Sequence, residues 1–277
     1  MSASLSTAHA LLRNVFGFSA FRPGQEEIVT AVLDGENVLA VMPTGSGKSL
    51  CYQLPAIARP GLTVVVSPLI ALMRDQVRSL TAAGVAAGSL NSSNEPAENA
   101  RVVTLLRKGE LRLLYLAPER LARPDTVEML AESDVSLMAI DEAHCVSQWG
   151  HDFRPEYLTL GSLARQIGGR LQTMALTATA DAPTRGDIVD KLFADPPRTF
   201  VRSFDRPNLR LAFKPKERSS KQVLAFVKSH DGESGIVYCA SRRKVEELAE
   251  TLKKEGVNAL PYHAGLDKSV QIGRAHV

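Results

Sequence analysis

Residues 38–49, VLAVMPTGSGKS, decide the fold of this 277-residue chain. An apolar run typical of a buried strand leads into a turn with Gly45 and Gly47, and a helix is expected from Lys48 onward. Glycine permits positive φ angles and a close approach of the backbone to an anion, so that successive N–H groups point at a phosphate. The helix adds the positive end of its dipole. The stretch therefore predicts a phosphate-binding loop between a strand and a helix.

The side chains of this loop suit a nucleotide with a divalent cation. Lys48 would reach the β- and γ-phosphates as a mobile charge, and the hydroxyl of Ser49 would ligate Mg²⁺. Met42 departs from the strict G-x-x-x-x-G-K-[ST] pattern, because it stands where that pattern has its first glycine. A Gly-rich surface turn is the alternative interpretation. The nucleotide contacts predicted in the loop are Thr44, Gly45, Ser46, Gly47, Lys48 and Ser49.

A second polar stretch, Asp141-Glu142-Ala143-His144, follows an expected strand at 137–141. Ligands of open α/β sheets bind at the carboxyl ends of strands. Asp141 can hold Mg²⁺, and Glu142 can orient and deprotonate an attacking water. An exposed acidic turn would have the same letters, but the phosphate loop earlier in the chain favours a shared site. We therefore predict Lys48, Asp141 and Glu142 as catalytic residues.

Short apolar runs alternate with amphipathic stretches along the chain, as in a parallel sheet covered by helices. The expected strands are 37–42, 62–67, 112–116, 137–141, 172–176, 199–201, 235–239 and 257–262. The expected helices are 25–33, 48–58, 70–82, 95–108 and 242–254, the last capped by Gly256. We expect a nucleotide-binding domain at 1–203, a linker at 204–220, a partial second domain at 221–270 and a non-native tail at 271–277.

Composition is that of an ordinary globular chain, with 44% hydrophobic and 23% charged residues. Three widely spaced cysteines without a C-x-x-C pair indicate reduced thiols, a cytoplasmic location and no zinc site in this chain. No apolar stretch approaches the length of a membrane span. Residues 1–201 have a formal charge of −3 and residues 202–277 one of +6, which favours a polyanionic partner or a solvated basic surface.

Several strings resemble the RecQ DNA helicases of superfamily 2, among them FGFSAFRPGQ, MPTGSGKSLCYQLPA, IDEAHCVSQWGHDFRPEY, ALTATA and YHAGL. The run CVSQWGHDFRPEY directly after the acidic box distinguishes that family from other helicases. The resemblance covers residues 12 to about 270. It implies a RecA-like P-loop domain with a central parallel sheet, followed by the start of a second RecA-like domain. It further implies ATP and Mg²⁺ as cofactors, single-stranded and partly duplex DNA as partners, a nucleoid-associated location, and 3′–5′ translocation that unwinds duplexes in DNA repair and recombination.

The resemblance also assigns roles to single residues. Phe18 would stack on adenine, with Arg22 and Gln25 contacting the base and nearby phosphates; a core aromatic is the alternative for Phe18. The predicted DNA contacts are Pro68, Arg74, Arg120, Trp149, His151, Phe153, Arg154, Ser241, Arg242, His263 and Gly265. Gln148, Thr177 and Thr179 would couple DNA binding to hydrolysis. Buried loop anchors are the alternative for Trp149 and Phe153, a strand-end cap for the two threonines, and a strand-end polar residue for His263.

The family pattern continues beyond YHAGL to a motif with an arginine finger, whereas this chain ends QIGRAHV. We therefore expect a C-terminally truncated fragment that hydrolyses ATP poorly. Residues 272–277 back-translate to a common sequencing adapter, which is why the tail is expected to be non-native. Two alternatives stay open: an RNA-remodelling ATPase of the same superfamily, disfavoured by the QWGHDFRP loop, and a non-catalytic module that binds ATP or DNA.

Overall fold

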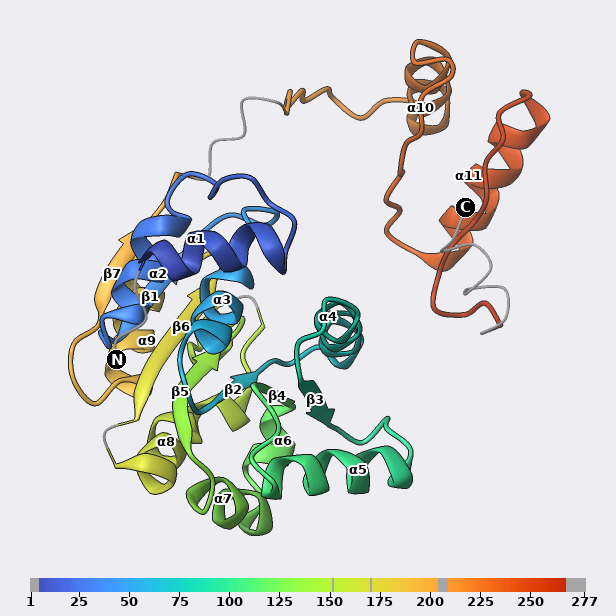
Figure 1. Ribbon diagram of the computed structural model, residues 1–277. Coiled ribbons are helices and arrows are strands. Elements are labelled where there is room, and N and C mark those ends of the chain that lie inside the picture. The colour runs from blue at the N-terminus through green and yellow to red at the C-terminus, as the bar shows by residue number, and fades with distance from the viewer. Residues whose placement is uncertain (1–4, 151, 170, 204–208, 268–277) are drawn as a thin grey trace. The chain divides into compact units, whose positions relative to one another are not determined.

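The computed structural model describes residues 5–150, 152–169, 171–203 and 209–267. The chain divides into two compact units, residues 1–205 and 206–277 (Figure 1). The predicted tail at 271–277 and the first residues of the predicted linker, 204–208, lie outside the described residues.

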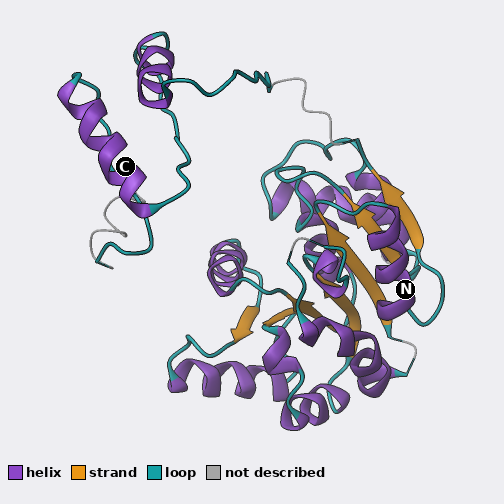
Figure 2. Ribbon diagram, turned by 180° about the vertical axis from the view of Figure 1, so that it is seen from behind, coloured by secondary structure: helices purple, strands orange, loops and turns teal. Residues whose placement is uncertain are grey.

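A seven-stranded, fully parallel sheet forms the centre of the first unit (Figures 1 and 2). Its strand order is β3-β4-β2-β5-β6-β1-β7. The strands are β1 Val38–Val41, β2 Leu62–Val66, β3 Ala87–Leu90, β4 Leu113–Leu116, β5 Val135–Ile140, β6 Gln172–Thr177 and β7 Arg198–Val201. The α/β fold class and the parallel sheet expected from the sequence are confirmed.

Helices cover both faces of this sheet. The helices of the first unit are α1 Leu5–Asn14, α2 Gln25–Leu33, α3 Leu50–Ala58, α4 Ile70–Ala82, α5 Pro96–Arg107, α6 Pro118–Leu121, α7 Pro124–Ala131, α8 Leu160–Gly168 and α9 Ala182–Leu192, with 3₁₀ turns η1 Ala143–Val146 and η2 Pro155–Thr159. Apolar residues of α2, α3 and α4 pack in one core cluster, and those of α5 to α9 pack in another. Successive strand residues alternate between the clusters, because Leu39 and Val41 belong to one and Val38 and Ala40 to the other.

The strand β3 was not among the expected strands. Its sequence, Ala87-Gly88-Ser89-Leu90, contains neither a β-branched nor an aromatic residue, whereas each of the other strands contains at least one. It pairs with β4 at the sheet edge, where Gly88 lies so close to Val102 of α5 that a side chain would crowd the helix. Tertiary packing therefore decides this strand.

Two helices, α10 Ser219–Lys228 and α11 Arg242–Lys254, make up the regular structure of the second unit in residues 209–267. The expected strands at 235–239 and 257–262 are wrong, because neither segment is paired in a described ladder. A strand needs a neighbour for its N–H and C=O groups, and the alternating apolar pattern alone supplies none. Helix α11 does end as expected, with Gly256 at φ +84° and the N–H of Val257 donating to the Leu252 carbonyl at 3.0 Å.

Candidate functional site

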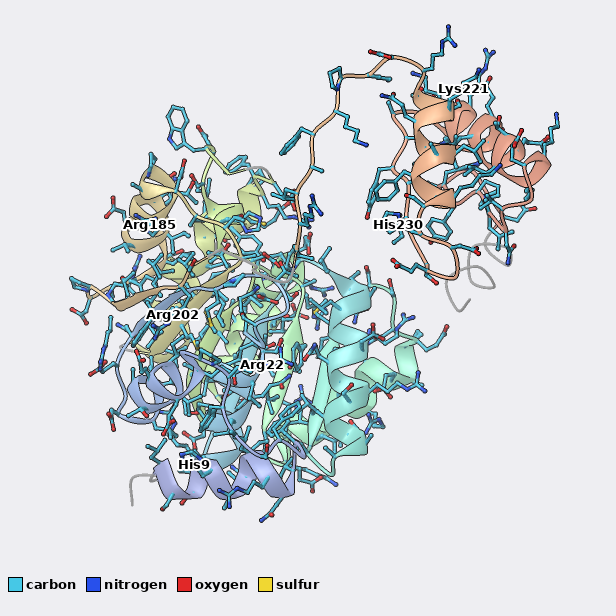
Figure 3. All side chains as sticks on the ribbon, turned by 90° about the horizontal axis from the view of Figure 1, so that it is seen from above. His9, Arg22, Arg185, Arg202, Lys221 and His230 are labelled. Atoms are coloured by element: carbon cyan, nitrogen blue, oxygen red, sulfur yellow. The ribbon has the colours of Figure 1, made fainter. Side chains whose placement is uncertain are left out.

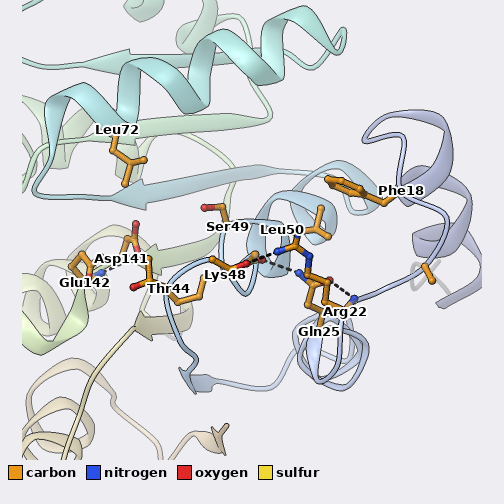
Figure 4. Close-up of a pocket in the computed structure, with 13 residues that line it drawn as sticks. Phe18, Arg22, Gln25, Thr44, Lys48, Ser49, Leu50, Leu72, Asp141 and Glu142 are labelled. Atoms are coloured by element: carbon orange, nitrogen blue, oxygen red, sulfur yellow. Dashed lines mark hydrogen bonds between the residues drawn. The ribbon is translucent and has the colours of Figure 1, made fainter. Parts of the chain in front are cut away.

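A cavity of about 370 Å³ opens at the carboxyl ends of β1 and β5 (Figure 4). Figure 4 shows residues of the first 25 positions, the phosphate loop and the acidic box around one space. The residues that line it are Phe18, Ala20, Arg22, Gln25, Thr44, Gly45, Gly47, Lys48, Ser49, Leu50, Leu72, Asp141 and Glu142. The structure thus brings together nearly all of the residues predicted to bind nucleotide and metal. The exception is Ser46, which is in the same loop but does not line the cavity.

Side chains outside the phosphate loop hold it by donating hydrogen bonds to its carbonyl groups. The amide of Gln25 donates to the carbonyls of Ser46 and Gly47 at 3.0 and 3.1 Å, and Arg22 donates to the carbonyl of Gly45. The other end of the Gln25 amide accepts from the N–H of Arg22 at 2.8 Å. Because Gly47 has φ +82° and a Cβ there would overlap the Gln25 amide, no other residue fits without strain. Gln25 therefore shapes the loop, because both ends of its amide bond backbone groups.

Met42 explains how the loop departs from the strict glycine pattern. Its side chain is fully buried in the core cluster of α2 to α4, and its N–H donates to the Thr177 carbonyl at 3.0 Å, which adds one hydrogen bond to β6 just beyond the end of β1. The ammonium of Lys48 donates to the Met42 carbonyl at 3.3 Å. The position serves packing and holds the lysine at the cavity.

The two carboxylates of the acidic box have different environments. Asp141 is buried, and this burial together with the nearby charge of Glu142 raises the pKa of Asp141 to about 6. Its carbonyl accepts from the hydroxyl of Tyr157 at 2.9 Å. Glu142 has φ +49°, and it is the only non-glycine residue with positive φ among the described residues. Strained backbone of this kind clusters at functional sites.

A chain of polar contacts leads from Glu142 to the end of β6. Nδ1 of His144 lies 3.3 Å from a carboxylate oxygen of Glu142 and 2.9 Å from the hydroxyl of Thr177. The Thr177 hydroxyl donates to the Thr179 carbonyl at 3.0 Å. Thr177 is fully buried and Thr179 is exposed. His144 and Tyr157 are not among the predicted site residues, although His144 stands inside the acidic box.

The residues after the acidic box place one large aromatic ring in solvent. Trp149 is 76% exposed, so its alternative role as a buried anchor is wrong. Phe153 is half-buried, Gln148 is exposed, and Arg154 bonds Asp152 at 3.1 Å and the Pro68 carbonyl at 3.4 Å. His151 lies outside the described residues.

Sequence similarity to known proteins identifies the family of this chain. A family model described as "DEAD/DEAH box helicase" matches residues 22–187. The chain belongs to the DEAD/DEAH box helicase family. It is 48% identical over 265 residues to the ATP-dependent DNA helicase RecQ of Haemophilus influenzae and 41% identical over 268 residues to that of Bacillus subtilis. Each match covers 96% of this chain but only 43% and 45% of the relative, so the chain spans less than half the length of these relatives.

Solved helicase structures share the fold of this family member. The DUF1998 helicase MrfA bound to DNA matches with a TM-score of 0.73 and 18% identity, over 98% of this chain and 42% of MrfA. The Mycobacterium smegmatis helicase Lhr bound to single-stranded DNA and AMP-PNP matches with a TM-score of 0.63 and 22% identity, over 96% of this chain and 39% of Lhr. At these identities the likeness concerns the fold alone.

The remaining predicted DNA contacts do not line the cavity. Pro68 and the exposed Arg74 lie before and within α4, and Arg120 of α6 pairs with Asp125 at 3.5 Å. Four further residues gather at the start of α11 in the second unit: Ser241, Arg242, His263 and Gly265. There, His263 contacts Glu246 at 3.1 Å, so it has a partner on α11 and is not at a strand end.

The donor set at the cavity fits Mg²⁺. The Asp141 carboxylate and the Ser49 hydroxyl are oxygen donors of the kind Mg²⁺ prefers, and both line the cavity. Within the part of the chain that the structure describes, no three His, Cys, Asp or Glu side chains group to hold a metal by themselves. The site therefore suits an ion that shares its ligands with a nucleotide.

Among the helices of the described residues, none has the length and apolar character of a membrane span.

Proposed function

We propose that this chain is the nucleotide-binding portion of an ATP-dependent DNA helicase, which couples ATP hydrolysis to 3′–5′ movement along single-stranded DNA and to duplex separation in repair and recombination. The observation that carries the proposal is the single cavity shared by Phe18, the phosphate loop and the acidic box. The RecQ relatives support DNA as the substrate, because they are named ATP-dependent DNA helicases.

In the proposed site, ATP lies along the cavity from Phe18 to Asp141. The Phe18 ring, half-exposed at the cavity, offers a face for adenine. Lys48 exchanges its bond to the Met42 carbonyl for the β- and γ-phosphate oxygens, which are stronger acceptors because they are charged. The loop carbonyls are already bonded to Arg22 and Gln25, so ATP binding needs little further ordering of the phosphate loop.

Glu142 is the proposed general base for the attacking water. It lines the cavity, and its side chain is held by Nδ1 of His144 at 3.3 Å. Asp141 and Ser49 would hold Mg²⁺, which would supply charge neutralisation at the phosphates. Most of the rate in phosphoryl transfer comes from positioning and charge neutralisation, which is the work divided among Lys48, Asp141 and Glu142.

DNA is proposed to bind at the residues after the acidic box. Trp149 presents an exposed ring on which an unpaired base can stack, at about 1–3 kcal/mol per base. Arg154, beside Pro68, is placed to meet a phosphate. The contacts of His144 with Glu142 and Thr177 offer a physical path from the end of β6 to the proposed catalytic base.

Single-turnover hydrolysis by the chain tests the proposal. ATP with Mg²⁺ is mixed with excess protein, with single-stranded DNA, with RNA of the same sequence, or with neither. We expect DNA to accelerate hydrolysis more than RNA does, and Glu142→Gln to remove hydrolysis while ATP binding persists. Hydrolysis by Glu142→Gln at the wild-type rate, or stronger stimulation by RNA, would overturn the assignment.

A further inference from the structure

The exposed Trp149 sits on a tight turn, residues 147–150, here called the Trp149 turn. The hydroxyl of Ser147 accepts from the N–H of Trp149 at 3.2 Å, and the N–H of Gly150 donates to the Ser147 carbonyl at 3.1 Å. A Cβ at Gly150 would lie 2.6 Å from the His144 carbonyl oxygen, so the chain passes too close there for any side chain. The indole is in solvent, but its backbone is fixed.

A side chain from helix α9 anchors this turn. The fully buried hydroxyl of Ser147 donates to a carboxylate oxygen of Asp187 at 2.7 Å. Lys191, one helical turn on, pairs with the same oxygen at 3.2 Å and donates to the Val146 carbonyl at 3.4 Å. The Ser147 hydroxyl and Lys191 hold the pKa of Asp187 below its ordinary value. Asp187 therefore stays ionised and available as an acceptor.

Helix α9 also follows directly on the segment that contacts His144. It starts just after Thr179, with Asp181 capping it through the Thr184 N–H at 3.0 Å. Arg185, labelled in Figure 3, donates to the Ala180 carbonyl at 2.9 Å. The segment 177–180, which contacts His144, thus leads directly into the helix that carries Asp187.

We infer that Asp187 is a positioning residue for DNA binding, which holds the Trp149 turn, through Ser147, in the conformation that presents the indole to an unpaired base. The inference rests on the proposed function, because it takes Trp149 as a stacking surface. Asp187 itself does not touch DNA. Its loss would loosen the turn without removing the ring.

Trp149 is the only tryptophan of the chain, so its fluorescence reports on this turn alone. The chain is titrated against a dye-labelled single-stranded oligonucleotide, and the anisotropy of the tryptophan emission is recorded without DNA. We expect Asp187→Asn and Ser147→Ala to lower the tryptophan anisotropy and to weaken DNA binding about threefold to fivefold, less than Trp149→Ala, which removes the ring. Asp190→Asn is the matched control, since Asp190 is an exposed aspartate on the same helix.

Double variants separate a positioning role from general damage to the fold. In the Trp149→Ala background, Asp187→Asn should weaken DNA binding no further, because its effect passes through the ring that is gone. Ser147→Ala with Asp187→Asn should equal the worse single variant. Asp187→Asn that matches Asp190→Asn in anisotropy and affinity, or that adds fully to Trp149→Ala, would overturn the inference. Unchanged binding by Trp149→Ala would instead overturn the proposed role of Trp149.

Discussion

Nδ1 of His144 lies 2.9 Å from the hydroxyl of Thr177, and this contact joins the acidic box to the end of β6. The Thr177 hydroxyl donates its only hydrogen to the Thr179 carbonyl, so its oxygen accepts from His144. The network therefore assigns the imidazole proton to Nδ1, the same nitrogen that faces Glu142 at 3.3 Å. One imidazole thus joins residues 177–179 to the proposed catalytic base.

Replacing Thr177 with valine tests this link. The change keeps the shape and removes the hydroxyl, which leaves the buried His144 nitrogen with one partner fewer and costs about 1–3 kcal/mol of stability. We expect ATP binding to persist and stimulation of hydrolysis by single-stranded DNA to fall severalfold. Thr173→Val, on the same strand but away from the cavity, is the control, and equal DNA stimulation in both variants would contradict the link.

Stability of the nucleotide-free, Mg²⁺-free chain should depend on pH through Asp141. Its pKa is about 6 in the folded chain against 3.8 as the ordinary value, so the folded state binds the proton more tightly than the unfolded state. The stabilising effect of that proton is full below pH 4 and is lost as the pH rises through 6. Asp141→Asn carries no charge at any pH. Its advantage over wild type in urea unfolding should grow by roughly 1–2 kcal/mol from pH 5 to pH 8, and a constant difference would refute the assignment.

The positive φ angle at Glu142 predicts which of two substitutions there is more stable. A left-handed conformation costs a residue with a Cβ roughly 1–2 kcal/mol, so Glu142→Gly should be more stable than Glu142→Ala by about 1 kcal/mol. At Glu128, exposed inside helix α7, the order should reverse by about 1 kcal/mol. Thermal or urea unfolding of the four variants gives both differences, and the same order at both positions would show that residue 142 is not strained.

Gln25 should matter more for the phosphate loop than for the base. Gln25→Glu sets a carboxylate against the carbonyls of Ser46 and Gly47, replacing two hydrogen bonds with repulsion at a buried site, at a cost of at least about 2 kcal/mol. We expect it to weaken ATP and GTP binding alike, measured by calorimetry. Loss of ATP binding with unchanged GTP binding would point to base recognition instead.

Much of the first unit could be predicted, because the local sequence pattern there favours the same helices, strands and turns that the packed domain contains. Helices α2 and α4 have the predicted bounds, and the glycines of the phosphate loop have the positive φ that its turn requires. The expected nucleotide and metal residues share one cavity because parallel strands bring their carboxyl ends to one edge. Their roles in catalysis stay predictions.

The features that escaped prediction depend on distant partners. β3 is a strand because β4 accepts it, and residues 235–239 and 257–262 are not strands because no described neighbour pairs with them. Met42 looked like a defect in a motif, whereas burial in the core accounts for it. Asp187 lies 40 residues from Ser147, and no local spacing signals their hydrogen bond.

Binding of ATP with Mg²⁺ to the chain, measured by isothermal titration calorimetry for wild type, Lys48→Ala and Lys108→Ala, tests the central claim most directly. Lys48 lines the cavity, whereas Lys108 is an exposed lysine at the end of α5. We predict saturable binding by wild type and Lys108→Ala, and binding at least about tenfold weaker by Lys48→Ala, since a charged contact contributes about 1.5–3 kcal/mol. Equal binding by Lys48→Ala and wild type would contradict the assignment of this cavity to ATP.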